Sequence, residues 1–457
     1  MLGECRFQTT TARAIALTAA AAALSVVAAA PAAAEWTAPL TVSHPHTAAW
    51  VNRPVFTSNG ATVVSWRWQD GLGNGSTVGS SMATSPAAEA PFETQRALPA
   101  GTLAGPQAYA AARLVVATQT GTGSTATLSV RFGDVKGRFG LPRRIARAQN
   151  LRGAQLDVNA RGDAVLGWWV DDGVKNDRVY VSLRPHGGSF GPAMRLAVGR
   201  IRGLAVAIGA RGDVLAAWDA LGVVRTRFKG RSVRTFGAVD ELRSHPAFNA
   251  ALQTAVTPAG RAWVAWTAQL LSEGGDRGDV FVEVATRPQR AHRLQPAVLL
   301  QRAPRSATAA PVSLAAGPSG AVILAWSMWD DWLAAQPGFT EIRAATIHAA
   351  GPPQITTLAR FASVELRDSA VAAAAHNGDT TVLWTQSTEV MTDANRVLVS
   401  VRPSSADWSS PDLVYQGRGA AGTVAYPPGA SQPIVVFGDR VAATPLSSRV
   451  IRVTTRR

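Results

Sequence analysis

Short hydrophobic runs that end in tryptophan recur along the chain. In six segments a Gly stands six residues before a Trp, and the residues between them are mostly hydrophobic. These segments are Gly60–Trp66, Gly162–Trp168, Gly212–Trp218, Gly260–Trp266, Gly320–Trp326 and Gly378–Trp384. Weaker copies pass through 114–117 and 434–437, so that successive copies lie 48 to 60 residues apart. Spacing of this kind indicates one structural unit repeated eight times.

The first half of each unit has the pattern of a β-hairpin. The hydrophobic run 204–208 is followed by a short polar turn that contains Gly212, and then by the run 214–218. The second run is hydrophobic at successive positions, as expected for a strand that is covered on both faces. The residue before the Trp is small in most copies, as at Gly167 and Ala217, which leaves room for a neighbouring sheet.

The second half of each unit also repeats. Residues 179–185 (VYVSLRP) resemble 397–403 (VLVSVRP), and an aromatic-to-proline segment follows in several units, at 139–142, 190–192 and 408–411. Four strands in each repeat predict an all-β fold, a β-propeller of four-stranded antiparallel blades. We predict eight blades. Seven is the alternative, because 439–446 and 449–455 read as two strands of the last unit.

The N-terminal part of the repeat region predicts how the ring closes. Residues 36–40 have the fourth-strand pattern, with no earlier strands before them. The last unit supplies early strands and stops without that pattern. We therefore expect the N-terminal strand to complete the last blade.

The first 34 residues have the pattern of a secretory signal peptide. Arginines precede the apolar stretch 14–30, and the small residues 32–34 form the cleavage site. We expect a single propeller domain at 35–457 and a secreted, extracellular monomer. A membrane anchor is the alternative for this segment, but no second apolar run of about 18 residues follows, so we expect no membrane span after cleavage. The single cysteine, Cys5, precedes the apolar stretch, which leaves no disulfide.

The net charge of the chain is positive, but it predicts no specific partner. The chain has 45 Lys and Arg against 30 Asp and Glu, a formal net charge of +15. It contains no basic helix, clustered basic run or basic–aromatic motif, so we predict a solvated basic surface and no nucleic-acid partner. Attraction to anionic cell-wall polymers is the functional alternative.

Acidic residues and tryptophans gather in the loops that follow the Trp-ended runs. These loops are long in four units, at 169–177, 273–279, 327–332 and 389–393. Long loops on a rigid scaffold often contain binding residues. The candidate ligand-binding residues are Trp329, Asp330, Asp331 and Trp332, followed by Trp169, Asp171 and Asp172. We expect the ring to bring the four loops together as an acidic, aromatic mouth at its central channel.

This combination of residues is typical of carbohydrate sites, because indole rings stack on sugar faces and carboxylates accept hydrogen bonds from hydroxyl groups. The opposing interpretation is that the 329–332 loop packs one Trp against its own blade and leaves its acids solvated. Carboxylates also suit Ca²⁺, for which Asp171, Asp172 and Asp177 are candidate ligands. Their spacing matches no EF-hand loop, so we predict no cofactor and keep Ca²⁺ as the alternative.

The tripeptide Arg-Gly-Asp begins at Arg161, Arg211 and Arg277. The first two copies fall in short hairpin turns, where Gly and Asp are common. We therefore interpret these two copies as turn geometry and not as adhesion motifs.

The Gly-to-Trp hairpins, the Arg-Pro ends of the third strands and the signal peptide together resemble secreted actinobacterial β-propeller proteins of the sialidase-like type. The resemblance extends over residues 36–457 and implies the fold, but no activity. Sialidases use an arginine triad, a Tyr nucleophile paired with Glu and an Asp acid/base, and their blades contain Ser-x-Asp-x-Gly-x-Thr-Trp boxes. No such box occurs here, and residues 143–146 (RRIA) are the nearest string to the Arg-Ile-Pro motif. No catalytic residue is transferred from the family.

The sequence therefore predicts a secreted, non-enzymatic binding module for a glycan or another cell-envelope ligand. One alternative is a glycoside hydrolase or lyase, whose acid and base would be carboxylates of the long loops about 5 to 10 Å apart. Another is a scaffold for protein–protein interaction, which would expose a broad apolar patch.

Overall fold

A computed structural model of the chain describes most of residues 35–456. Outside the description lie residues 1–34, 47, 71–76, 88–89, 104, 110–111, 122–124, 174–175, 243–246, 272–276, 305–306, 318–319, 321, 331–338, 349–350, 363–369, 388–394, 418, 441–448 and 457. The predicted signal peptide is thus outside the described residues. The repeats belong to one compact unit, Glu35–Arg457. In the part of the chain that the structure describes, no helix has the length and hydropathy to cross a membrane.

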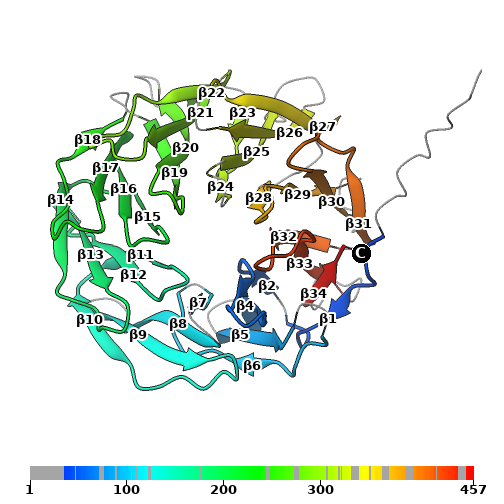
Figure 1. Cartoon of the computed structure of the whole chain (residues 1–457), viewed down its shortest axis with the longest axis horizontal. Coiled ribbons are helices and arrows are strands. Elements are labelled where there is room, and N and C mark those ends of the chain that lie inside the picture. Colours follow the sequence, from blue (N-terminus) through cyan, green and yellow to red (C-terminus); the bar gives the residue numbers. More distant parts are fainter. Residues whose placement is uncertain are drawn as a thin grey trace, which may run out of the picture. The chain divides into compact units, whose positions relative to one another are not determined.

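The strands form eight antiparallel blades around a ring, which is an eight-bladed β-propeller (Figure 1). Blade 1 contains β2 (Ala48–Val51), β3 (Val55–Phe56), β4 (Thr62–Asp70), β5 (Thr77–Ser85) and β6 (Arg96–Ala97). Blade 2 contains β7 (Gln107–Tyr109), β8 (Arg113–Thr120), β9 (Ala126–Asp134) and β10 (Arg143–Ala148). Blade 3 contains β11 (Leu151–Val158), β12 (Ala164–Val170), β13 (Asp177–Arg184) and β14 (Met194–Gly199). Blade 4 contains β15 (Gly203–Ile208), β16 (Val214–Ala220), β17 (Val223–Lys229) and β18 (Asp240–Glu241).

The second half of the ring repeats this arrangement. Blade 5 contains β19 (Ala247–Val256), β20 (Ala262–Leu271), β21 (Arg277–Arg287) and β22 (Val298–Ala303). Blade 6 contains β23 (Ala307–Ala309), β24 (Ser313–Ala316), β25 (Val322–Asp330), β26 (Phe339–Ile347) and β27 (Gln354–Ala362). Blade 7 contains β28 (Val371–Ala374), β29 (Thr380–Ser387), β30 (Asn395–Arg402) and β31 (Asp412–Gly417). Blade 8 contains β32 (Gly419–Ala425), β33 (Ile434–Arg440), β34 (Arg449–Thr455) and β1 (Leu40–Thr41).

The two ends of the repeat region meet in blade 8. Strand β1 pairs antiparallel with β34, with Leu40 opposite Val453 and Thr41 opposite Arg452. The amide of Thr37 also donates to the carbonyl oxygen of Thr455 over 2.9 Å. The predicted closure by the N-terminal strand is confirmed. Strand β1 is thus the fourth strand of blade 8, and the described strands form eight blades, which replaces the seven-bladed alternative.

The glycine at the start of each Gly-to-Trp segment has a conformational role in the first turn of its blade. In all six strong copies, this glycine has a φ between 84° and 94°, in the left-handed region that favours glycine. Its amide donates to the carbonyl oxygen three residues earlier, for example from Gly162 to Asn159 over 2.9 Å and from Gly212 to Gly209 over 2.9 Å. A type I turn followed by a left-handed residue is a common β-hairpin connection.

The tryptophan at the end of each Gly-to-Trp segment fills the space between blades. All six are at most 1% exposed, and Phe437 takes the same position in blade 8. Trp218 of blade 4 packs against Val165 and Val179 of blade 3, so the indole faces the preceding blade. The small residue before the tryptophan faces the other way, and Ala217 packs in one cluster with Trp266 of blade 5. Large and small residues on opposite faces of one strand therefore let each blade contact both neighbours.

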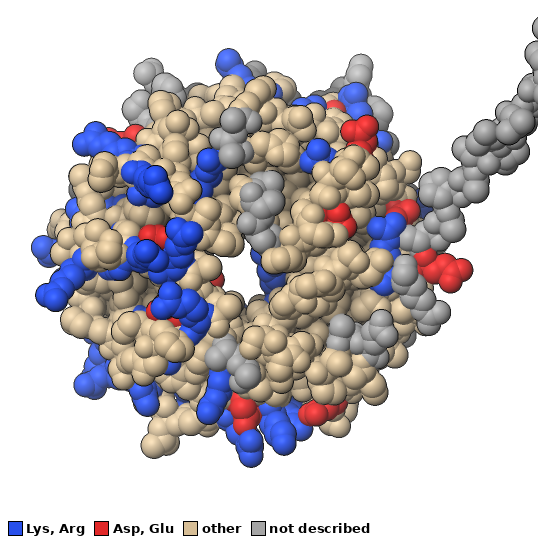
Figure 2. Space-filling view, in the orientation of Figure 1, with Lys and Arg blue, Asp and Glu red and all other residues tan. Residues whose placement is uncertain are grey.

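Antiparallel pairing sorts the connections onto two faces of the ring. The turns between first and second strands lie on one face, which is termed the turn face. The connections between second and third strands, and those between successive blades, lie on the opposite face, which is termed the loop face. Figure 2 shows an opening at the centre of the ring. Lys and Arg side chains gather on the part of the ring that contains β9–β18.

Candidate functional site

A cavity of about 550 Å³ opens on the loop face where blade 2 meets blade 3. One wall is the rim strand β10 with the two residues that follow it, and the other wall comes from β12, the loop after β12, and β13. Its polar lining consists of Arg147, Gln149, Asn150, Asp171, Asp172, Arg178 and Tyr180, and its apolar lining consists of Ile145, Ala146, Ala148, Trp168, Val170 and Ala193. This hollow is termed the loop-face cavity.

Two carboxylates predicted from the sequence lie on this wall. The Oδ1 atom of Asp171 accepts a 2.9 Å hydrogen bond from the amide of Gly173, and the Oδ1 atom of Asp172 accepts a 3.0 Å bond from the amide of Asn176. The Oδ2 atom of Asp171 lies 3.9 Å from Nε of Arg152. One oxygen of each carboxylate thus shapes the loop, and both side chains border the cavity.

Asp177 has a different environment from its two neighbours. It is buried, and its Oδ2 atom accepts a 2.8 Å hydrogen bond from the amide of Ile201, at the start of the next blade. Its Oδ1 atom accepts a 3.2 Å bond from the amide of Asp172. These two hydrogen bonds link the loop to the connection between blades 3 and 4.

Among the described residues, no three His, Cys, Asp or Glu side chains are grouped as a metal site requires.

An aromatic pair forms part of the cavity wall. The rings of Trp168 and Tyr180 stack with a centroid distance of 5.7 Å and an interplanar angle of 17°. The two residues are cross-strand partners on β12 and β13. Trp168 is buried and Tyr180 is half-buried, so Tyr180 is the ring that a ligand can reach. A phenol of this kind offers both an apolar face and a hydroxyl group.

Two arginines contribute positive charge to the same cavity. Arg147 on β10 and Arg178 on β13 are exposed, and neither pairs with a carboxylate among the described residues. They come from different blades and balance the charges of Asp171 and Asp172. The sequence analysis missed both arginines, because only the contact between blade 2 and blade 3 places Arg147 near the predicted loop.

Trp169 has a packing role in blade 3. It lies on the opposite face of β12 from Trp168, against Gly153 of β11. A Cβ atom at Gly153 would lie 1.5 Å from Cζ3 of this indole, so no side chain fits beneath it. Gly153 also has a φ of 51°. Trp169 is outside the lining of the loop-face cavity.

The other predicted loop is described only at its beginning. Trp329 is half-buried on β25, opposite Thr308 and Thr340, and Asp330 is the last residue of that strand. Asp331 and Trp332 lie outside the described residues, as do most of the loops at 273–279 and 389–393. The common acidic, aromatic mouth thus stays a prediction. Asp171 and Asp172, by contrast, border a groove between two blades.

A further carboxylate lies on the innermost strand of blade 3. Asp157 is half-buried on β11, where Oδ2 accepts a 2.8 Å hydrogen bond from the amide of Ile208 in blade 4 and Oδ1 accepts a 3.0 Å bond from the amide of Val158. Desolvation raises the pKa of Asp157 to about 6, against the lowering effect of these two amides and of the Arg53 charge. Its hydrogen bond to Ile208 joins two blades next to the central channel.

Of the comparisons with known proteins, the comparison with solved structures found similar chains. No family model matches this chain, and no curated protein matches its sequence. The similar solved structures include an ulvan lyase of a polysaccharide lyase family, with a TM-score of 0.45 and 10% identity over 92% of this chain and 93% of that one. A sialidase from Streptococcus pneumoniae has a TM-score of 0.37 and 10% identity, over 92% of this chain and 70% of that one. An α-L-arabinanase from Penicillium chrysogenum has a TM-score of 0.32 and 10% identity, over 66% and 93%.

Proposed function

We propose that this protein is a secreted, non-enzymatic carbohydrate-binding propeller whose ligand occupies the loop-face cavity. The observation that supports this proposal is the chemistry of the cavity wall. The half-buried ring of Tyr180, the acceptors Asp171 and Asp172, and the donors Arg147 and Arg178 line one hollow. Its volume of about 550 Å³ is within the range of small-molecule sites, roughly 300 to 1,000 Å³.

Each of these groups has a counterpart on a sugar. The ring hydrogens of a pyranose can pack on the phenol face, and its hydroxyl groups can donate to the two carboxylates. The side-chain amides of Gln149 and Asn150 both donate and accept hydrogen bonds. A carboxylate substituent on the sugar would find Arg147 or Arg178. Glycans of the cell envelope combine hydroxyl and carboxylate groups, so they are the proposed ligand class.

Secretion is part of the same proposal, because residues 1–34 have the pattern of a signal peptide. The full-length chain, expressed in a bacterial host with a general secretion system, should appear in the extracytoplasmic fraction. N-terminal sequencing of that material should begin at Glu35. Retention in the cytoplasm with an intact N-terminus would contradict secretion and leave the cavity proposal unaffected.

The test of the cavity uses side chains that are exposed. Binding of glycans is measured by calorimetry for the wild type and for the variants Arg147→Gln and Arg178→Gln. A single lost charge-assisted hydrogen bond should weaken binding by about tenfold or more. Arg396→Gln is the matched control, because Arg396 is an exposed arginine on β30 of blade 7. Equal affinities for all four proteins would place the ligand elsewhere.

The enzyme alternative depends on the same carboxylates, and product formation distinguishes it from binding. A glycan that binds is incubated with the protein, and the reducing ends and the unsaturated products are both measured. Turnover that disappears in Asp171→Asn or Asp172→Asn would replace the binding proposal by a hydrolase or lyase. Calcium and a chelator are included, because Asp171 and Asp172 are the candidate ligands.

A further inference from the structure

A second cavity, of about 420 Å³, lies on the turn face between blades 3 and 4. The charged residues of its lining are Arg161, Asp163, Arg184, Arg211, Lys229 and Arg231. Five of these residues are cationic and one is anionic. This hollow is termed the turn-face cavity, and it is separate from the loop-face cavity.

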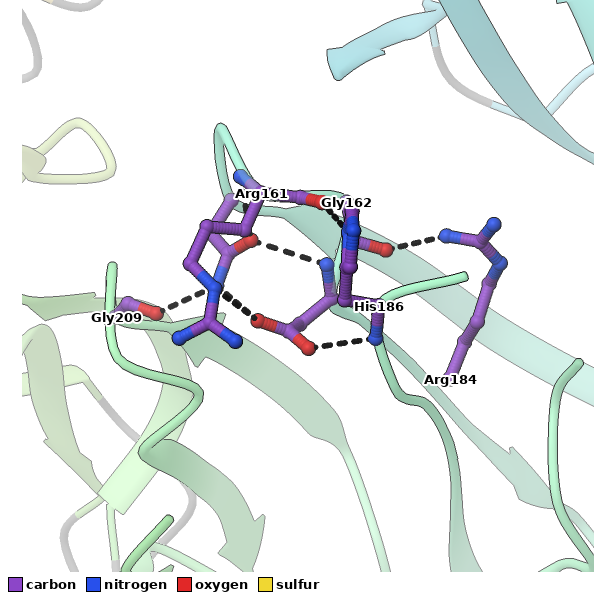
Figure 3. A network of polar contacts seen from close by, with 7 residues as sticks. Arg161, Gly162, Arg184, His186 and Gly209 are labelled. Carbon is purple, nitrogen blue, oxygen red and sulfur yellow. Dashed lines mark hydrogen bonds and ion pairs between the residues drawn. The ribbon is translucent and has the colours of Figure 1, made fainter. Parts of the chain in front are cut away.

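The first two Arg-Gly-Asp copies build opposite sides of this cavity, and their aspartates face the backbone. Figure 3 shows this network around Gly162. Asp163 accepts a 2.8 Å hydrogen bond from the amide of His186 at Oδ1 and a 3.0 Å bond from Asn159 Nδ2 at Oδ2. In the next blade, Asp213 accepts a 2.9 Å bond from the amide of Arg231. Both aspartates thus pin the turn after the third strand to the first turn of the same blade.

Because the two aspartates bond to backbone amides, they neutralise little of the positive charge of the motif arginines, Arg161 and Arg211. Nε of the exposed Arg161 lies 3.7 Å from Oδ2 of the half-buried Asp163, which is a stretched ion pair. Arg211 and Arg231 are exposed and have no carboxylate partner among the described residues. The repeat spacing of 50 residues places the two motif arginines at the same position in adjacent blades.

The other two cations of the cavity are held in place. Arg184 donates from Nη1 to the carbonyl oxygen of Gly162, and its guanidinium lies 5.2 Å from the ring centroid of Tyr109 and 4.9 Å from that of Phe132. Nζ of Lys229 has a carbonyl oxygen, that of Gly230, at 3.4 Å. Desolvation lowers the pKa of Lys229, opposed by the charge of Asp213. An anion in the cavity would offset the cost of keeping Lys229 charged.

The charge around the cavity is not spread evenly over the ring. Residues 126–242 contain 20 Lys and Arg and 10 Asp and Glu, so this quarter of the chain has a net charge of +10 out of +15. Figure 2 shows the corresponding crowding over β9–β18. A localised positive field of this kind attracts polyanions and increases their rate of association.

We propose that the turn-face cavity binds an acidic polysaccharide, a glycan chain that bears sulfate or carboxylate groups. Guanidinium groups bind both kinds of oxyanion through paired N–H donors. Adjacent blades present Arg161 and Arg211 at equivalent positions, which suits a polymer whose charges repeat. The described part of the lining contains no aromatic residue on which a base could stack, so a glycan fits better than a single-stranded nucleic acid.

The test uses the double variant Arg211→Gln/Arg231→Gln, because both side chains are exposed. Binding to heparin, polygalacturonate, uncharged dextran and an oligothymidylate is measured at low and at moderate salt. We expect wild-type binding to one or both acidic glycans, no binding to dextran, and a loss of roughly tenfold in the variant together with a weaker salt dependence. Heparin and polygalacturonate distinguish sulfate from carboxylate recognition.

The matched control is Arg200→Gln/Arg396→Gln, which removes the same charge. Arg200 lies in the same basic region but on the loop face, and it is exposed. Equal weakening in both double variants would overturn the proposal in favour of diffuse electrostatic attraction. Tighter binding of the oligothymidylate than of either acidic glycan would overturn it in favour of nucleic acid. The loop-face proposal is tested at Arg147 and Arg178, and this proposal is tested at Arg211 and Arg231, so failure of one proposal and failure of the other appear in different variants.

Discussion

Nδ2 of Asn159 donates a 2.9 Å hydrogen bond to the carbonyl oxygen of Gly209, which occupies the same turn position one blade later. The Oδ1 atom of Asn159 also accepts 3.0 Å bonds from the amides of Arg161 and Asp163. One buried side chain therefore fixes its own hairpin turn and ties blade 3 to blade 4. Chain neighbours of both residues, Arg161 and Ile208, line the turn-face cavity.

Replacing Asn159 should destabilise the ring at that point. Asn159→Ala leaves two partly buried amides without their acceptor and the buried carbonyl oxygen of Gly209 without its donor, so the free energy of unfolding should fall by about 1 to 3 kcal/mol. Urea titration of the wild type and the variant measures this difference. Asn377→Ala is the control, because Asn377 is exposed in the corresponding turn of blade 7 and, among the described residues, its side chain bonds only to Asp379 of that turn. A smaller effect at Asn159 than at Asn377 would contradict the inter-blade role.

The small residue before each tryptophan sets the distance to the next blade. A Cβ atom at Gly167 would lie 2.7 Å from Cγ1 of Val206 and 3.1 Å from Cδ2 of Leu204 in blade 4. Gly167→Ala should therefore lower the free energy of unfolding by about 1 to 3 kcal/mol through overpacking. At Gly140 the nearest atom to an added Cβ is 3.6 Å away, so Gly140→Ala should be tolerated. Equal stabilities of the two variants would argue against tight packing of blades 3 and 4.

Closure of the ring depends on a short N-terminal strand. Removing residues 35–43 from a chain that begins at Glu35 deletes the partner of β34, including the 2.8 Å bond from the amide of Ile451 to Oγ of Ser43. Hydrogen exchange of the peptide 449–456 should then accelerate, whereas the peptide 395–402 on β30 should keep its protection. Unchanged exchange of 449–456 would show that β1 is not needed to hold blade 8.

The stability of the ring should depend on pH through Asp157. Its pKa is about 6 in the folded protein against an ordinary value of 3.8. A raised pKa means that the folded state binds the proton more tightly than the unfolded state does. The protonated Asp157 therefore adds to the free energy of unfolding. This stabilisation is complete below pH 3.8 and is lost as the pH rises through 6. The stability of the wild type relative to Asp157→Asn should therefore fall between pH 4 and pH 7. Thermal unfolding of both proteins across this range measures the difference, and a difference that is constant with pH would contradict it.

Much of the fold could be predicted because each repeat contains both the glycine that its first turn needs and the tryptophan that packs against the neighbouring blade. Gly162 and Gly212 are needed for a left-handed turn residue, and Trp168 and Trp218 fill the space toward the preceding blade. These requirements recur at fixed spacing, so the sequence reveals the blades and their number. The closing strand was predictable because residues 36–40 have a pattern whose first three strands are absent before them.

The candidate sites were harder to predict, because their walls come from different blades. Asp171 and Asp172 were found by the length and acidity of their own loop, but Arg147 approaches them from the rim strand of blade 2. The Arg-Gly-Asp turns were identified as turns, yet the direction of each side chain depends on backbone amides about 20 residues away along the chain, such as that of His186. Asp157 has no local signal, since its pKa depends on the surrounding blades.

The most direct test of the proposed function is calorimetric titration of the wild type, Arg147→Gln and Arg178→Gln with soluble fragments of cell-envelope glycans. We predict saturable binding to at least one fragment by the wild type, and affinities about tenfold lower or worse in both variants, with Arg396→Gln indistinguishable from the wild type. Absence of binding by the wild type across the fragments, or equal binding by all four proteins, would contradict the assignment of the loop-face cavity as a carbohydrate site.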